Sequence, residues 1–134
     1  MILQFQTTNT EMPSPAEVKA IYSRVAQADE RGDHKTSLKL MRQLGERGHG
    51  YTQYLLGLRY DEGIDVSVDY AEALKWYLLA ADYGISGAKY ELGVMYSDGR
   101  GVKKNLKRAV KWFKRFGEEP CTCPNCTEMK CTEC

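Results

Sequence analysis

The residues best suited to chemistry are the five cysteines, all of which lie within the last 14 residues of the chain. Cys123 and Cys126 form one C-x-x-C pair, Cys131 and Cys134 form a second, and Cys121 is left over. A C-x-x-C pair places two thiolates on one tight turn, and two such turns can complete a tetrahedral Cys₄ site. The cysteine-rich tail, residues 118–134, is therefore predicted to bind zinc through these four paired cysteines.

Other chemistry stays open for this tail. The four residues between the two pairs are fewer than the roughly 12 to 20 that separate the pairs of typical zinc modules. The same thiols could serve a thiol-redox function, or the tail could be disordered and hold no defined ligand. Disulfides are disfavoured in a reducing compartment, and the odd Cys121 argues against a closed set of them.

The remaining residues carry no recognisable catalytic arrangement. His34 and His49 have no serine or cysteine in a nucleophile motif beside them, so both are expected to be surface histidines. The G-R-G run at 99–101 is typical of a turn and lacks the pattern of a phosphate-binding loop. We therefore expect a protein without catalytic activity.

Composition favours one soluble domain. The chain has 134 residues, of which 43% are hydrophobic and 28% charged, and its formal net charge is +1. That charge argues against attraction of the whole surface to nucleic acid or to an anionic membrane. The first 12 residues lack a signal-peptide pattern, and no apolar run is long enough to cross a bilayer, so a cytoplasmic location is expected.

The elements that must carry any function come from a repeat. When residues 51–81 are shifted by 36 positions onto 87–117, nine of the 31 aligned positions are identical. They include a leucine–glycine pair (Leu56-Gly57 and Leu92-Gly93) and two tryptophans, Trp76 and Trp112. A period of this length is the signature of a stacked-repeat architecture.

Each copy predicts two helices with defined contacts. Residues spaced by four mark one buried stripe on the first helix: Thr52, Leu56 and Tyr60, then Ala88, Leu92 and Tyr96. A glycine in the middle of this helix, Gly57 or Gly93, predicts close approach of the second helix. Gly63 and Gly99 are expected to end the first helix in the left-handed conformation.

The second helix of each copy has its own cap and anchors. Asp69 and Asn105 are expected to cap it, and Glu72 would complete a capping box with Asp69. The tryptophans and Phe113 are expected to lie in the core.

A fainter copy precedes the two strong ones. Ser14 and Glu17 predict a capping box, and the apolar spacing that follows predicts a helix to about Arg31. Asp33 is expected to cap a second helix. The predicted organisation is a flexible arm (1–13), a helical-repeat region (14–117, with units 14–48, 51–84 and 87–117) and the cysteine-rich tail.

The pattern A-x3-L-G-x2-Y-x2-G-x-G-V-x2-D-x3-A-x2-W-x3-A-A-x2-G resembles the Sel-one-like repeat, a tetratricopeptide-like helix pair. The resemblance covers 51–117 strongly and about 15–48 weakly. It implies an all-α fold, a short right-handed α/α solenoid of about three helix pairs, whose relatives act mainly as adaptors that hold proteins in a concave groove. Asp65 replaces the second turn glycine of the first strong copy, so that turn is expected to bend differently.

If the first helices line the concave side, as the resemblance implies, their remaining positions face a partner, a peptide or a single helix. Tyr54 and Tyr90 would then be paired aromatic anchors, of the kind enriched at interfaces. The alternative is that these tyrosines fill space between repeats. The predicted partner-binding residues are Tyr54, Leu58, Asp61, Glu62, Tyr90, Val94, Ser97 and Asp98.

A basic run lies at the end of the repeat region. Residues 100–115 contain eight basic residues and no acidic one. The favoured interpretation is a solvated outer face of the last helix. The alternative is a basic surface that recruits an acidic partner, RNA or a membrane.

The zinc prediction is tested by the metal content of the freshly reduced protein. Mass spectrometry under native conditions should find one zinc per chain, and the metal should be lost when residues 118–134 are removed. Replacing Cys121 by serine should leave the zinc content unchanged, because Cys121 stands outside both pairs. Less than one equivalent in the reduced full-length chain would contradict the prediction.

Overall fold

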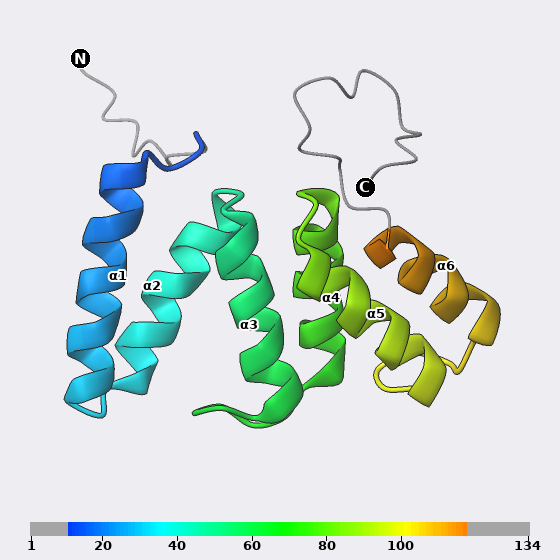
Figure 1. The fold of residues 1–134 in the computed structure, drawn as a ribbon. Helices are drawn as coiled ribbons and strands as arrows, with labels where there is room; N and C mark the ends of the chain where they lie inside the picture. Colours follow the sequence, from blue (N-terminus) through cyan, green and yellow to red (C-terminus); the bar gives the residue numbers. More distant parts are fainter. Residues whose placement is uncertain (1–10, 118–134) are drawn as a thin grey trace, which may run out of the picture.

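The chain folds into a row of α-helices (Figure 1). The computed structural model describes residues 11–117, and within that range it contains six helices and no strand. Each helix packs against the next one along the chain, which confirms an all-α solenoid of three helix pairs. The helices are α1 (Pro15–Glu30), α2 (His34–Glu46), α3 (Gly50–Glu62), α4 (Tyr70–Asp82), α5 (Ser86–Asp98) and α6 (Leu106–Gly117).

Side-chain caps begin α1 and α2 at the residues that the sequence predicts. The Ser14 N–H donates to the Glu17 carboxylate at 2.7 Å, and the Glu17 N–H donates to the Ser14 hydroxyl at 3.2 Å. Asp33 accepts the N–H of Thr36 at the start of α2. These bonds satisfy donors that the first helical turn leaves without an intrahelical partner.

The start of α4 differs in one respect from the prediction. Asp69 accepts the N–H groups of Ala71 and Glu72, so it is the cap. The Glu72 carboxylate, however, pairs with Arg42 of α2 at 3.2 Å, and the Asp69 N–H donates to the backbone oxygen of Tyr60. The predicted capping box of Asp69 and Glu72 is therefore wrong, because an ion pair between repeats takes the glutamate.

Left-handed residues make the turns after α3 and α5. Gly63 has φ of 69° and Gly99 has φ of 72°, as predicted. Asp65 has φ of 59° and its counterpart Gly101 has φ of 69°, so the two turns share this backbone conformation. The expectation that Asp65 bends its turn differently is wrong. Aspartate tolerates the left-handed region better than most residues, and the Asp65 carboxylate lies 3.3 Å from Nδ1 of His34.

The mid-helix glycines let the two helices of each strong repeat approach closely. A Cβ added to Gly57 would lie 2.5 Å from the ring of Tyr77 in α4. A Cβ added to Gly93 would lie 2.5 Å from the ring of Phe113 in α6. The prediction of close approach is confirmed at both positions. The predicted stripe beside these glycines is also buried in full: Thr52, Leu56 and Tyr60 in α3, and Ala88, Leu92 and Tyr96 in α5.

The last helix is covered less than the sequence predicts. Trp76 in α4 is only 2% exposed, whereas its counterpart Trp112 in α6 is half-buried. Phe113 is 36% exposed, so its prediction as a core residue is wrong. The reason is that nothing in the described part of the chain packs on the far side of α6, as α5 packs on α4.

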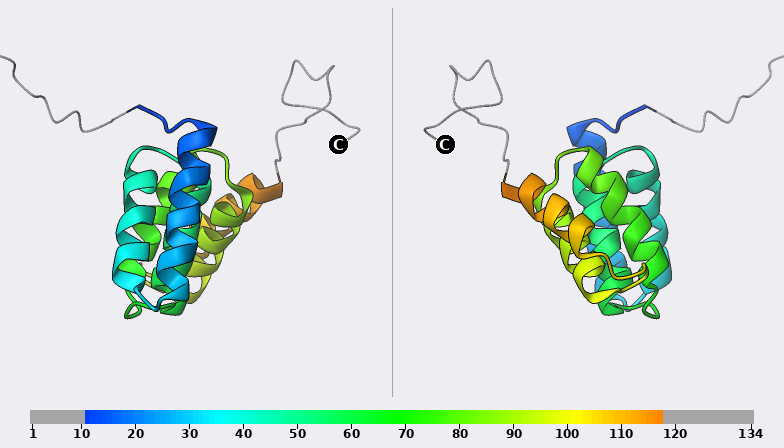
Figure 2. Two further views of the ribbon diagram at one scale, coloured as in Figure 1. Left: turned by 90° about the vertical axis from the view of Figure 1, so that its left-hand side faces the viewer. Right: turned by 90° about the vertical axis from the view of Figure 1, so that its right-hand side faces the viewer.

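The helices divide between two sides of the molecule. The side views of Figure 2 show α2 and α4 along one side and α5 with α6 toward the other. The backbones of α3 and α5, the first helices of the two strong repeats, come close to each other, whereas the backbones of α2 and α4 stay farther apart, as do those of α4 and α6. Over these repeats the side with α3 and α5 is therefore the inner one. None of the helices within 11–117 is long and apolar enough to span a bilayer.

Replacing Gly57 by alanine tests the close approach. Helix propensity alone would stabilise this variant by up to about 1 kcal/mol. Overpacking against the Tyr77 ring should outweigh that gain, since forcing an extra carbon into a packed core costs about 1–3 kcal/mol. Urea unfolding should therefore give a net loss of stability. The control is Gly117→Ala, where an added Cβ meets no atom within 4 Å. A Gly57→Ala protein more stable than the original would contradict the packing.

Candidate functional site

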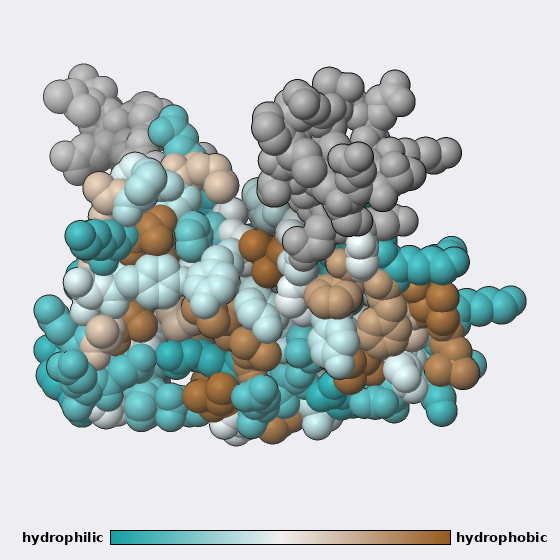
Figure 3. Space-filling view, in the orientation of Figure 1, coloured by the Kyte–Doolittle hydropathy of each residue, from teal (hydrophilic) through white to brown (hydrophobic). Residues whose placement is uncertain are grey.

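The predicted partner-binding residues lie on α3 and α5, on the inner side of the two strong repeats; this surface is called the α3–α5 face below. Figure 3 shows hydrophobic residues interspersed with hydrophilic ones over the side of the molecule that faces the viewer, from α1 to α6. The eight residues differ in exposure. Glu62, Tyr90 and Asp98 are exposed, Asp61 is buried, and the other four are half-buried: Tyr54, Leu58, Val94 and Ser97.

Tyr54 joins the two strong repeats and keeps part of its ring at the surface. Its ring lies 6.1 Å from that of Tyr77 and 6.4 Å from that of Tyr51, measured between centroids. A Cβ added to Gly87 at the start of α5 would lie 2.7 Å from Cζ of Tyr54. Partial burial raises the pKa of Tyr54 above its usual value. Tyr54 thus fills space between repeats and also reaches the surface, so both sequence-based interpretations describe part of its role.

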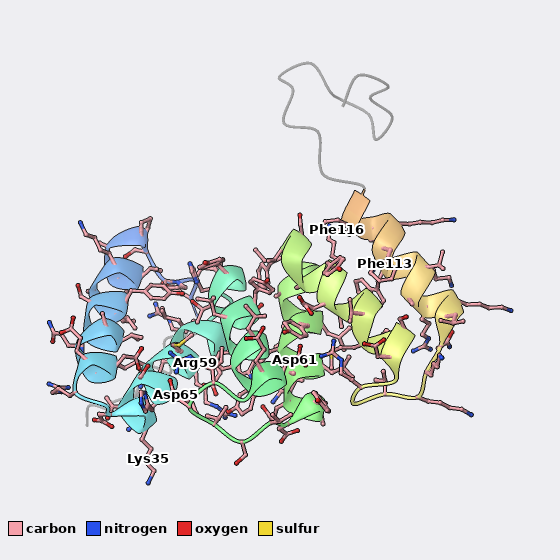
Figure 4. All side chains as sticks on the ribbon, turned by 60° about the horizontal axis from the view of Figure 1, so that its bottom comes forward. Lys35, Arg59, Asp61, Asp65, Phe113 and Phe116 are labelled. Atoms are coloured by element: carbon pink, nitrogen blue, oxygen red, sulfur yellow. The ribbon has the colours of Figure 1, made fainter. Side chains whose placement is uncertain are left out.

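Tyr90 belongs to an exposed aromatic cluster with two phenylalanines of α6. It is 46% exposed, and its ring centroid lies 5.7 Å from that of Phe113 and 5.5 Å from that of Phe116. Figure 4 labels both phenylalanines on α6. Phe116 is 40% exposed. Tyr90, Phe113 and Phe116 therefore present a partly open aromatic surface at the end of the α3–α5 face.

Asp61 corrects the sequence-based expectation of a partner-facing side chain. It is 7% exposed, accepts the hydroxyl of Tyr77 at 3.2 Å and pairs with Arg100 at 2.9 Å. Burial, and then the charge of Asp61, raises the pKa of Tyr77. The bonds join α3, α4 and the turn after α5, and Asp61 is held inside the fold by them. A buried carboxylate needs such partners, because its desolvation is costly.

The carboxylates that stay near the surface make the α3–α5 face acidic. Glu62 and Asp98 are exposed at the ends of α3 and α5, and Asp98 lies 3.8 Å from Nε of Arg100. Glu91 of α5 is half-buried, and burial, with smaller effects of Asp61 and Glu62, raises its pKa. A cation brought to Glu91 would oppose that shift.

Sequence reasoning missed some residues of this surface. Tyr51 is 55% exposed and continues the aromatic surface from Tyr54. Its place one helical turn before Tyr54 was a usable signal. For Phe116 and Glu91 the sequence gives no such signal, because neither has an equivalent of the same residue type 36 positions earlier.

The two histidines have structural partners. His49 is the cap of α3: its Nδ1 accepts the N–H of Thr52, and its ring meets Tyr22 of α1 edge-on at 6.3 Å. Burial lowers the pKa of His49. His49 is therefore part of the contact between α1 and α3 and differs from the surface histidine that the sequence predicts.

His34 lies between the turns of the first two repeats, beside Asp29 and Asp65. The ligand atoms of these three residues lie within 4.8 Å of one another, which is a spacing that could hold a metal ion. Arg59, however, pairs with Asp29 at 3.3 Å and approaches Asp65 at 3.9 Å; Figure 4 shows Arg59 beside Asp65. A guanidinium already balances these carboxylates, so the cluster is an ion-pair network that joins two repeats.

Two predicted features stand apart from this face. Cys121, Cys123, Cys126, Cys131 and Cys134 lie outside the described residues, so the zinc site stays a prediction. In the basic run, Arg100 is partly buried beside Asp61, whereas the other seven basic residues are exposed: Lys103, Lys104, Lys107, Arg108, Lys111, Lys114 and Arg115.

Comparisons with known proteins identify the repeat. The chain is similar to the Sel1 repeat protein from Oxalobacter formigenes, with 28% identity and a TM-score of 0.62 over 71% of this chain and 39% of that one. It is also similar to c5321, a protective antigen of uropathogenic Escherichia coli with an SLR fold, with 28% identity and a TM-score of 0.68 over 77% of this chain and 23% of that one.

The chain therefore spans less than half the length of these two solved structures. A comparison with curated proteins finds no match. The family model of the Sel1 repeat matches residues 50–84 and 86–119, which together make up just over half of the chain. These are the two copies whose helix pairs are α3–α4 and α5–α6, and the chain belongs to the Sel1 repeat family.

Proposed function

We propose that this protein is a non-catalytic scaffold that binds another protein through the α3–α5 face. Sel1 repeat solenoids are commonly protein-interaction scaffolds. The observation that carries the proposal is the exposed aromatic surface formed by Tyr90, Phe113 and Phe116, with Tyr51 and Tyr54 beside it on α3. Aromatic side chains of this kind are enriched among the residues that dominate binding energy.

The face suits a short segment, such as a peptide or a single helix. Two strong repeats offer a small surface, and the half-buried Leu58 and Val94 add apolar area between its aromatic and acidic parts. Glu62, Glu91 and Asp98 favour basic residues in the bound segment, because opposite charges steer association and suppress wrong partners. Asp61 is left out of the proposed binding residues, since Tyr77 and Arg100 occupy its carboxylate.

The metal-binding or redox alternative uses the repeats as a scaffold for the cysteine-rich tail. It rests on the spacing of Cys123, Cys126, Cys131 and Cys134 alone, and the zinc measurement described above tests it. The two functions are compatible in one chain. Removal of the tail distinguishes them, because partners bound by the α3–α5 face would be retained.

Tyr90→Ala tests the binding face. Proteins cross-linked to the full-length chain in its native source would be identified, and the affinity of the principal one measured with purified components. Truncating an interface anchor costs about 2 kcal/mol or more, so affinity should fall by roughly 30-fold. Thermal unfolding should change little, because Tyr90 is nearly half exposed.

The matched control is Tyr83→Ala. Tyr83 is 53% exposed and follows α4 on the other side of the molecule. It should leave the affinity of this partner unchanged within about twofold. Equal binding by the Tyr90 and Tyr83 variants would rule out the aromatic cluster as the binding surface.

A further inference from the structure

A hollow lies on the side of α2 and α4, away from the α3–α5 face. Arg42 of α2 pairs with Glu72 of α4, and a pocket of about 310 Å³ opens between the two helices. A neighbouring hollow of about 390 Å³ continues along α2 and shares Arg42 and Glu46 with it. We call the two together the α2–α4 trough. The residues used below are Lys35, Lys39, Gln53, Lys75, Trp76 and Tyr83.

The trough is strongly basic. Its walls contain five cationic side chains and one carboxylate, that of Glu46. Arg42 and Arg47 already pair with glutamates of the fold. Among the described residues, no carboxylate lies within 4 Å of the other three, which are Lys35, Lys39 and Lys75. Three ammonium groups without a carboxylate partner therefore remain along one trough, and that of Lys75 lies 5.6 Å from the centroid of the Trp76 ring. The net charge of the whole chain is only +1.

The wall also holds a buried donor and a buried acceptor without partners. Trp76 and Gln53 are each 2% exposed, and both line the pocket. The Gln53 amide nitrogen donates to the backbone oxygen of Gly45 at 2.9 Å, which leaves its oxygen to accept. Neither Trp76 Nε1 nor Gln53 Oε1 has a hydrogen-bond partner within the described part of the chain. Both atoms are closed to solvent, so a bound group can pair with them only after the surrounding side chains shift; each pairing would then remove a cost of about 1–3 kcal/mol.

We propose that the α2–α4 trough binds an acidic peptide segment of another protein. A peptide unit offers a carbonyl oxygen for Trp76 Nε1 and an N–H for Gln53 Oε1. Glutamate or aspartate side chains of the segment would meet Lys75, Lys39 and Lys35. A sulfate ion presents only acceptors and would leave Gln53 Oε1 unpaired. Tyr83 and Leu79, both exposed, form the rim over which the segment enters.

This site is separate from the α3–α5 face in position and in charge. One face carries exposed carboxylates and aromatic rings, and the other carries unpaired lysines. The Sel1 repeat unit would thus hold two segments of opposite charge on its two sides. Loss of either site by mutation should leave the other intact.

The test uses a fluorescein-labelled ten-residue peptide that alternates glutamate and serine, with its C-terminus amidated, and the full-length reduced chain. Fluorescence anisotropy should show saturable binding that weakens as salt is added. Lys39→Glu/Lys75→Glu should lower the affinity by at least about tenfold. The control Lys107→Glu/Lys111→Glu makes the same change in net charge on exposed residues of α6 and should alter the affinity less than about twofold. Lys39, Lys75 and Lys111 occupy equivalent positions 36 residues apart, so their helix environments are matched.

A second readout follows the indole N–H signals of the two tryptophans by NMR. Peptide binding should shift the signal of Trp76 and leave that of Trp112 in place, with the two signals assigned through Trp112→Phe. The same peptide with glutamine for glutamate should bind at least about tenfold more weakly. The proposal is overturned if the peptide does not bind, if the α6 control lowers affinity as much as the trough variant, or if only Trp112 responds. Complete displacement by inorganic phosphate at equal ionic strength would also overturn it, in favour of a simple anion site.

Discussion

The contact between a helix glycine and an aromatic ring of the next helix sets the shape of each strong repeat. Gly57 lies under the ring of Tyr77, and Gly93 lies under the ring of Phe113. With no Cβ in the way, each pair of helices closes to a distance that a larger residue would prevent. The glycine lowers intrinsic helix stability, but the packing that it allows brings the helices into register. The rest of the solenoid is built on these two close pairs.

Polar contacts then join one pair to the next. Arg42 of α2 bonds to the Tyr60 hydroxyl and to Glu72, so it links the first pair to both helices of the second. Asp61 of α3 joins the second pair to the third through Arg100, which lies in the turn after α5. Each contact is partly or fully buried, so it is screened less by salt than an exposed pair. Repeats held in this way present two different sides, one lined by α3 and α5 and the other by α2 and α4.

The third pair is covered less than the second, because no described helix packs on the far side of α6. Tyr77 is completely buried because α3 and α5 both lie against α4, whereas its counterpart Phe113 stays partly open. The same sequence position is thus core in one repeat and surface in the next. The open rings meet Tyr90, and the aromatic surface of the α3–α5 face arises from this difference in coverage.

The sequence by itself determined the repeat, its helix pairs, most caps and the buried stripes, because each depends on residues a few positions apart. The left-handed glycines and the close approach at Gly57 also follow from local pattern. Only the tertiary structure decided which charged and aromatic side chains are buried and which partners they contact. Asp61 is buried with Tyr77 and Arg100 as its partners, which come from other elements. Glu72 pairs with Arg42 of α2 and does not form the predicted capping box with Asp69. Burial and ion pairing depend on neighbours distant in sequence, and a 36-residue period alone does not specify which neighbours are present.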